Sequence, residues 1–171
     1  LVAHCPSTNM KITDGIAPIE ALRIAGAKLG LGTDGAASSG SYDILQEMRL
    51  AGMLAKVATM DSGALPNATL WSMLVGTAAH FRVTPPGTAG LVTVGVTADL
   101  TVIRYPSLHL IDETRFLSNL VFSATAGDVV HVVVDGQLVL RHGRFTRHDE
   151  DEVTARALRS MASMAPLPPT S

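Results

Sequence analysis

The side chain best placed for chemistry is the carboxylate of Asp34, which follows the short apolar segment 29–32 and precedes Gly35. That segment has the length and composition of a buried strand, and in a βα barrel the residues that follow a strand face the active site. A carboxylate there can bind a metal ion or accept a proton from water. Asp-Gly pairs are also common in turns, where the carboxylate caps the next helix, so the local sequence leaves both interpretations open.

A second group of polar side chains follows the apolar start of the chain, which has the pattern of a strand end. His4 and Cys5 are adjacent, and Asn9 lies four residues beyond Cys5. Neighbours in an extended chain point to opposite sides, so His4 and Cys5 are not expected to bind one metal ion together. His4 is a candidate pocket residue, Cys5 is typical of a small buried residue, and Asn9 either contacts a substrate or holds its loop.

Ser38 lies four residues after Asp34, in a segment of small residues. Its hydroxyl can contact a substrate or cap the local backbone, and the sequence does not distinguish these roles. The histidines of the chain form neither an H-x-H nor an H-E-x-x-H pattern. The residues alone therefore indicate no complete metal site.

The elements that must position these side chains are predicted from the spacing of apolar residues. The pattern of the first half indicates βα units of a parallel sheet or barrel. We expect a strand end at 1–5, a loop at 6–9 and a strand at 29–32, followed by a flexible segment at 36–40. Helices are expected over 17–28, 41–57 and 67–80.

The helix expected over 41–57 carries a regular apolar stripe. Ser41 is its expected cap, because a serine hydroxyl can accept a backbone N–H at a helix start. Glu47 and Arg49 are expected to lie off the buried face. The inward residues are Ile44, Met48, Ala51 and Ala55, with Leu45 and Leu54 beside them.

The second half of the chain indicates a small antiparallel β element, reached through a segment rich in proline and glycine. Leu100 and Val102 are the expected inward residues of its first strand. Asp135-Gly136 is a strong hairpin signal. We expect strands over 99–104, 129–134 and 137–140, a terminal helix over 153–164, and a Pro-rich tail.

Composition excludes several classes of function. The 171 residues contain 13 Lys and Arg against 15 Asp and Glu, which gives a formal net charge of -2 with no strong block of either sign. Nucleic acid is not an expected partner, because phosphate binding needs a basic patch. No membrane association is expected, since no apolar run approaches the roughly 20 residues that span a bilayer. The one cysteine allows no internal disulfide, so we expect a cytoplasmic protein.

Two segments carry a resemblance to a known family. Residues 4–11 (HCPSTNMK) resemble the seventh-strand segment of amidohydrolase-superfamily deaminases, and residues 31–38 (LGTDGAAS) resemble the eighth-strand segment. The match continues at 47–51, and segments within 90–100 and 127–136 resemble the small β domain of these enzymes. The chain is most similar to the 5-methylthioadenosine/S-adenosylhomocysteine deaminase branch, with chlorotriazine hydrolases and guanine-type deaminases close by.

The resemblance implies a fold and a division into domains. The fold is an α/β one: the last two βα units of a (β/α)8 TIM barrel, followed by part of a small β-sandwich. The implied domains are the barrel units at 1–82, the β-sandwich portion at 83–147, and a C-terminal helix and tail at 148–171.

The resemblance also implies a site and a cofactor. The family holds one divalent metal ion, Zn²⁺ or Fe²⁺, and Asp34 matches the residue that both binds this ion and accepts the proton of the attacking water. Ser38 matches a position near the substrate. His4 and Asn9 match the motif and are assigned to substrate binding on that basis.

The implied reaction is the hydrolytic deamination of a purine-type ring, as in S-adenosylhomocysteine or methylthioadenosine, with release of ammonia. An s-triazine or guanine-type amidohydrolase is the alternative within the family. A full barrel takes about 250 residues and a catalytic zinc needs three protein ligands, so the chain is expected to be a fragment that is inactive alone. Its parent is expected to be a homo-oligomer that acts on a small molecule. A non-catalytic interaction module is the alternative from another class.

Overall fold

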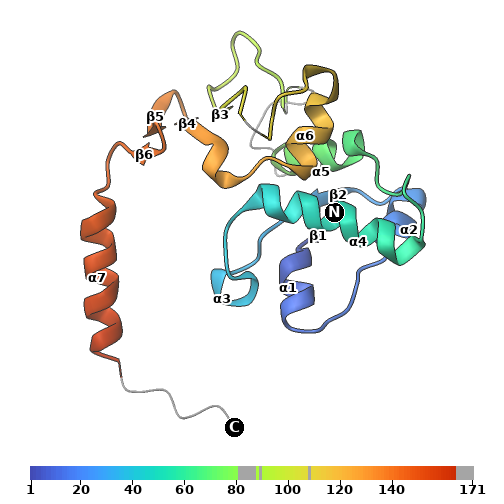
Figure 1. Cartoon of the computed structure of the whole chain (residues 1–171), viewed down its shortest axis with the longest axis horizontal. Coiled ribbons are helices and arrows are strands. Elements are labelled where there is room, and N and C mark those ends of the chain that lie inside the picture. Colours follow the sequence, from blue (N-terminus) through green and yellow to red (C-terminus); the bar gives the residue numbers. More distant parts are fainter. Residues whose placement is uncertain (81–87, 89, 108, 165–171) are drawn as a thin grey trace.

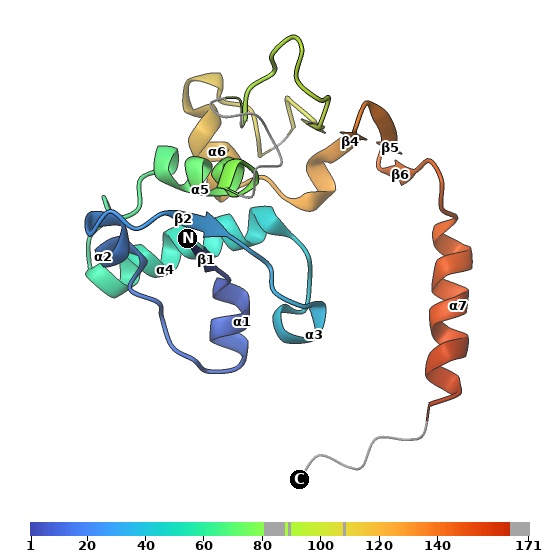
Figure 2. The ribbon, with the colours of Figure 1, turned by 180° about the vertical axis from the view of Figure 1, so that it is seen from behind.

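The chain has a mixed α/β architecture in a computed structural model that describes residues 1–80, 88, 90–107 and 109–164. Figure 1 shows helices gathered around a small sheet, a second sheet to one side, and a C-terminal helix that stands apart; Figure 2 shows the same arrangement from behind. The predicted domain boundary between 82 and 83 and the predicted Pro-rich tail lie outside the described residues.

Two short parallel strands lie at the centre of the N-terminal half. β1 (Val2–His4) pairs with β2 (Leu29–Leu31), and His4 lies opposite Leu31. Parallel strands need a crossover connection, and helices supply part of it. The helices of this half are α1 (Pro6–Lys11), α2 (Ile19–Ile24), α3 (Ala36–Ser39), α4 (Ile44–Thr59) and α5 (Asn67–His80). The predicted strand at 29–32 and the predicted helix over 67–80 are confirmed.

Two expectations for the connecting segments are wrong. The segment 6–9, expected to be a loop, lies in α1, because Pro6 occupies the first helical turn, where its missing N–H costs nothing. The segment 36–40, expected to be flexible, forms α3 and ends at Gly40, whose φ of 91° is left-handed. Both helices follow a strand of the parallel pair directly or after a short turn.

The cap of α4 is Asp43 and not the predicted Ser41. The Asp43 carboxylate accepts the N–H groups of Leu45 and Gln46 at 3.0 and 3.1 Å. The Ser41 hydroxyl instead accepts the Asp43 N–H at 3.2 Å, so it supports the cap from outside the helix. Both arrangements satisfy N–H groups that have no partner within a helix.

The inward face of α4 is confirmed in part. Met48, Ala51 and Ala55 are buried as predicted. The prediction that Glu47 lies off the buried face is wrong, because α1 packs against α4 and leaves its side chain 0% exposed. A burial of this kind requires polar partners, which are described with the site.

A helix of the second half completes the core. The sequence indicated only strands there, yet α6 (Phe116–Phe122), preceded by the 3-10 turn Glu113–Arg115, packs against both α4 and α5. Arg49 of α4 donates a hydrogen bond to the carbonyl of Ala124 just after α6. The core therefore joins the two halves, and its most buried side chains are Met48, Leu65, Leu70, Met73 and Val121.

The predicted antiparallel element is a four-stranded sheet in the order β3-β4-β5-β6. The Asp135-Gly136 hairpin is confirmed, and both residues have left-handed φ values of 50° and 72°, as the tight primed turns require. Val102 is 44% exposed and not inward, because a register shift between Val102 and Ile103 interrupts the alternation of the strand. The strands are β3 (Leu100–Ile103), β4 (Val129–Val134), β5 (Gln137–Arg141) and β6 (Arg144–Phe145).

The terminal helix α7 (Glu150–Ala162) stands apart from the rest of the chain (Figure 1). It confirms the helix predicted over 153–164 but begins three residues earlier, where the Asp149 carboxylate accepts the N–H groups of Asp151 and Glu152. None of its residues is buried. Across the described ranges of the chain, no helix is long and apolar enough to cross a membrane.

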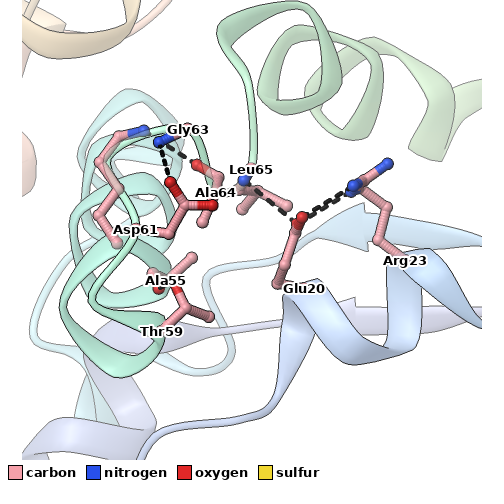
Figure 3. Close-up of polar contacts among 9 residues, drawn as sticks. Glu20, Arg23, Ala55, Thr59, Asp61, Gly63, Ala64 and Leu65 are labelled. Atoms are coloured by element: carbon pink, nitrogen blue, oxygen red, sulfur yellow. Dashed lines mark hydrogen bonds and ion pairs between the residues drawn. The ribbon is translucent and has the colours of Figure 1, made fainter.

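The loop between α4 and α5 is held by a cluster that we call the Glu20 corner, formed by Glu20, Arg23 and the Leu65 amide (Figure 3). One Glu20 oxygen accepts Arg23 Nη2 at 2.7 Å, and the other accepts Arg23 Nε at 2.9 Å and the Leu65 N–H at 3.2 Å. The Arg23 guanidinium lowers the pKa of Glu20. Lys56 Nζ holds the same loop by donating to the carbonyls of Ser62 and Ala64.

Candidate active site

The two parallel strands end at the same edge, which brings the segments that follow them together. His4 and Leu31 are paired, and the Gly32 N–H donates to the His4 carbonyl at 3.0 Å. The predicted site residues Asn9 and Ser38 lie on α1 and α3, and these two helices contact each other. Lys11 Nζ reinforces the contact by donating to the Ala37 carbonyl at 3.0 Å.

Asp34 has the backbone of a strained turn and a carboxylate that is open to solvent. Its φ of 55° is left-handed, a conformation that aspartate tolerates better than most residues. The capping interpretation finds no support, because α3 is capped by Gly35 without any side-chain hydrogen bond. Within the described part of the chain, the Asp34 carboxylate accepts no hydrogen bond, so both of its oxygens can serve a ligand.

Cys5 lies between the two strand ends and contacts both. Its Sγ accepts the backbone N–H of Asp34. The same Sγ would lie 3.0 Å from a Cβ added at Gly32, so a larger residue there would displace the Cys5 side chain. Burial raises the pKa of the Cys5 thiol, and the carboxylates of Asp34 and Glu47 raise it further against the opposing effect of the Asp34 N–H. Cys5 is therefore a neutral packing and hydrogen-bonding group at neutral pH.

Glu47 is the residue that sequence reasoning missed. One of its oxygens, Oε2, accepts the Ser7 N–H at 3.0 Å, in a bond that joins α4 to the start of α1. The other oxygen, Oε1, is buried and unpartnered among the described residues, as are the hydroxyls of Ser7 and Thr8. A signal was present in the sequence, since Glu47 lies three residues after Ile44 and four before Ala51, both assigned inward. We call Cys5, Ser7, Asp34 and Glu47 the site corner.

The remaining predicted residues have different environments. His4 is 4% exposed, and burial lowers its pKa to about 4, so its imidazole is neutral at neutral pH. Asn9 is half-buried on α1, where its N–H donates to the Cys5 carbonyl at 3.2 Å. Ser38 is half-buried on α3. The assignment of these three residues to substrate binding stays a prediction.

The site corner supplies too few side chains to bind a metal ion by itself. In the segments that the structure describes, no group of three or more His, Cys, Asp or Glu side chains could hold a metal ion. A catalytic zinc needs three protein ligands, and Asp34 offers one free carboxylate. The donor type fits Zn²⁺ or Fe²⁺, and an ion bound here would need further ligands from outside the described residues.

A mainly apolar cavity of about 630 Å³ lies elsewhere, between the start of α4, α5 and the antiparallel sheet. None of the site-corner residues lines it. Its walls include Tyr42, Leu74, Val96, Leu100 and Val129. The cavity and the site corner are therefore separate features of the fold.

A parallel strand pair with a free carboxylate just beyond its carboxyl edge is the arrangement expected of a βα hydrolase, and comparison with known proteins identifies the family. The amidohydrolase family model matches residues 1–139, so the chain belongs to the amidohydrolase family. The resemblance found in residues 4–11 and 31–38 is thus confirmed.

Particular relatives are similar over most of the chain. The 5-methylthioadenosine/S-adenosylhomocysteine deaminase of Pelotomaculum thermopropionicum is 38% identical over 156 residues, which is 91% of this chain and 36% of the relative. The zinc-bound crystal structure of an adenosine deaminase from Xanthomonas campestris superposes with a TM-score of 0.86 at 31% identity, over 94% of this chain and 36% of that one. The chain thus spans about a third of the length of the relatives it matches.

A third comparison supports the fold alone. The atrazine chlorohydrolase of Arthrobacter aurescens TC1, solved with zinc and atraton, superposes with a TM-score of 0.79 at 23% identity. It covers 92% of this chain and 35% of the chlorohydrolase. The architecture of this chain is therefore shared by a solved deaminase and a solved chlorohydrolase.

Proposed function

We propose that this chain is the C-terminal part of a metal-dependent amidohydrolase that deaminates a purine-type ring, with S-adenosylhomocysteine, methylthioadenosine or a related nucleoside as substrate. The observation that carries the proposal is the 38% identity to a deaminase of these substrates over 91% of the chain. The free carboxylate of Asp34 at the strand edge agrees with it. The parent enzyme hydrolyses a carbon–nitrogen bond, and the 171 residues alone are inactive because the metal site is incomplete.

In the proposed architecture, β1 and β2 are the last two strands of a (β/α)8 barrel and the antiparallel sheet is part of a β-sandwich. The domains are 1–82, 83–147 and 148–171. Exposed apolar residues at the first strand support this arrangement, since Leu1 is 55% exposed and Val2 is 36% exposed. Parallel strands are normally covered on both faces and flanked by further strands, so these side chains need neighbours from elsewhere.

Asp34 is the catalytic residue of the proposed mechanism. Its carboxylate would help to hold Zn²⁺ or Fe²⁺, and that ion would supply the Lewis acidity that lets water attack a ring carbon at neutral pH. The Asp34 carboxylate accepts the proton of the attacking water and delivers it to the departing ammonia. The left-handed turn, held by Cys5, keeps the carboxylate at the strand edge. Ser38, His4 and Asn9 contact the substrate in this proposal.

The proposal extends to the setting of the parent enzyme. Its partner is a small-molecule substrate, it forms a homo-oligomer, and it works in the cytoplasm. Nucleic acid and membranes are not partners, which agrees with the near-neutral charge of the chain.

The test is to express the chain together with the coding sequence that precedes Leu1 and to measure ammonia release from S-adenosylhomocysteine, methylthioadenosine and a chlorotriazine. Deamination of a purine nucleoside is expected, and Asp34→Asn should lower it by about 10²- to 10⁴-fold, since the proton acceptor is lost. Asp14→Asn is the matched control, because Asp14 is also an exposed aspartate in a loop.

Three outcomes contradict the proposal. Hydrolysis of the triazine without deamination of any nucleoside favours the alternative within the family. An equal activity of the Asp34→Asn and Asp14→Asn proteins removes the assigned role of Asp34. A reading frame that starts at Leu1 favours the non-catalytic interaction module, because no further ligands are then supplied in the same chain.

A further inference from the structure

Glu47 has no role in the mechanism above, yet it is the most completely buried charged side chain next to the site. We propose that Glu47 is a positioning residue, whose carboxylate fixes the start of α1 and, through Cys5, the left-handed turn that carries Asp34. The inference rests on the proposed function, because Asp34 is the residue being positioned. Glu47 itself touches neither substrate nor metal in this proposal.

The first link joins Glu47 to the backbone of α1. Glu47 is 0% exposed, and its Oε2 accepts the Ser7 N–H at 3.0 Å across 40 residues of sequence. Ser7 belongs to the first turn of α1, whose N–H groups have no partner within the helix. The carboxylate therefore substitutes for a side-chain cap, which α1 lacks at Cys5.

The second link joins the start of α1 to Asp34. Cys5 directly precedes α1, and its Sγ accepts the Asp34 N–H. Cys5 Sγ also packs closely against Gly32, two residues before Asp34, so a displacement of the first turn of α1 moves Cys5 and disturbs its contact with the Asp34 turn. The left-handed φ of 55° at Asp34 is costly for a residue other than glycine, so it needs such a constraint.

The choice of a carboxylate supports a functional reading of this contact. A buried charge with a single hydrogen bond is unfavourable, and apolar residues of similar volume are often as stabilising as buried ionic groups. In the described segments Glu47 has no cationic partner, and its Oε1 and the hydroxyls of Ser7 and Thr8 lack partners altogether. Unsatisfied buried groups of this kind are expected where positioning matters more than stability.

The experiment compares Glu47→Asp with Glu47→Gln in the full chain, using amide hydrogen exchange and the amide chemical shift of Asp34 measured by NMR. The aspartate keeps the charge but is one methylene shorter, so it cannot reach Ser7. The glutamine keeps an acceptor oxygen at the right distance and loses the charge. Glu152→Gln on the exposed helix α7 is the matched control for loss of a carboxylate.

Glu47→Asp is expected to accelerate exchange of the Ser7 amide by roughly three- to tenfold, the worth of one hydrogen bond, and to shift the Asp34 amide signal. Glu47→Gln should restore both to near their original values, and Glu152→Gln should change neither. Cys5→Ala should shift the Asp34 signal and leave the Ser7 amide protected, because it removes only the second link.

Two results overturn the proposal. Unchanged Ser7 exchange and an unchanged Asp34 signal in Glu47→Asp show that the contact positions nothing. Disturbance by Glu47→Gln as large as that by Glu47→Asp shows that an acceptor oxygen within reach of Ser7 is not what fixes the start of α1 and the Asp34 turn. The readouts do not involve catalysis, so they distinguish a failure of this inference from a failure of the deaminase proposal.

Discussion

Two glutamates hold backbone amides at opposite ends of α4, and their surroundings differ sharply. In the Glu20 corner, both carboxylate oxygens are occupied, by Arg23 and by the Leu65 amide (Figure 3). In the site corner, Glu47 accepts one amide, from Ser7, and keeps an oxygen that no described residue satisfies. The first carboxylate is 15% exposed at its side chain and the second is 0% exposed.

The difference in hydrogen-bond partners distinguishes a structural role for Glu20 from the proposed role of Glu47 beside the candidate active site. A carboxylate whose only task is to hold a loop can be paired with a cation near the surface, where desolvation is cheap. In the proposed enzyme Asp34 binds a metal ion, and an arginine beside it would compete with that ion. The absence of a cation next to Glu47 in the described residues agrees with this proposal.

The largest expected difference between the corners is in their response to acid. His4, at the strand end beside the site corner, has a pKa of about 4 when folded against 6.5 when unfolded. The unfolded chain therefore binds more protons between these values, so stability is complete above pH 6.5 and falls by about 3 kcal/mol as the pH drops to 4. Urea unfolding at a series of pH values measures the loss.

His4→Leu is the control for this prediction. It should flatten the stability profile between pH 6.5 and 4, since the group that takes up the proton is gone. The lowered pKa of Glu20, held by Arg23, acts on the acid side of this range, where stability is lost as the pH falls through the folded value. An unchanged slope in His4→Leu would show that the acid response belongs to another group.

The next largest effect concerns how tightly β2, the strand that leads to the site corner, packs against α5. A Cβ added at Gly30 of β2 would lie 2.6 Å from Thr77 Oγ1 of α5. Gly30→Ala should therefore lower the free energy of unfolding by about 1 to 3 kcal/mol, because either the strand moves away from the helix or the Thr77 hydroxyl gives up its hydrogen bond to the Met73 carbonyl.

Gly76→Ala is the control, since Gly76 lies on α5 next to Thr77, the residue that the added Cβ at Gly30 would meet. A Cβ at Gly76 meets nothing within 4 Å, and alanine is the better helix former, so the stability should rise by about 0.5 to 1 kcal/mol. Equal effects of the two alanines would contradict the close approach of β2 to α5.

A smaller effect is expected in the Glu20 corner. Glu20→Ala leaves the buried Leu65 amide without its acceptor and should lower the free energy of unfolding by about 1 to 2 kcal/mol. Glu20→Gln keeps an acceptor and gives up only a partly exposed ion pair, so its effect should be smaller. Thermal unfolding ranks the two variants, and a larger loss in Glu20→Gln would show that the charge dominates.

The smallest effect tests the corrected cap of α4. Asp43→Ala removes the acceptor for two N–H groups and should cost about 1 kcal/mol. Ser41→Ala should cost less, because its hydroxyl bonds only the cap residue. The reverse order in thermal unfolding would restore Ser41 as the cap that the sequence suggested.

The position of Asp34 could be predicted because its determinants are local. A short apolar run, a flanking glycine pair and the rule that strand ends face the site are all visible in one stretch of the chain. The Asp135-Gly136 hairpin was predictable for the same reason, since the turn geometry selects those two residues.

The hydrogen bond of Glu47 with Ser7 and the helix α6 could not be predicted, because each depends on contacts that are distant in sequence. Glu47 is buried by α1, and its partner Ser7 lies 40 residues earlier. α6 is stabilised by packing on α4 and α5, and its seven residues are too few to give a helical period that exceeds the β signals around it.

The left-handed turn at Asp34 has a consequence for the evolution of this family member. Asparagine tolerates the same backbone as aspartate, and the two codons differ by one nucleotide. In the proposed enzyme, a single base change at this position would keep the backbone turn while removing the proton acceptor. A descendant that binds the proposed substrate without turning it over would then be one mutational step away, which would give selection a direct route from an enzyme to a sensor.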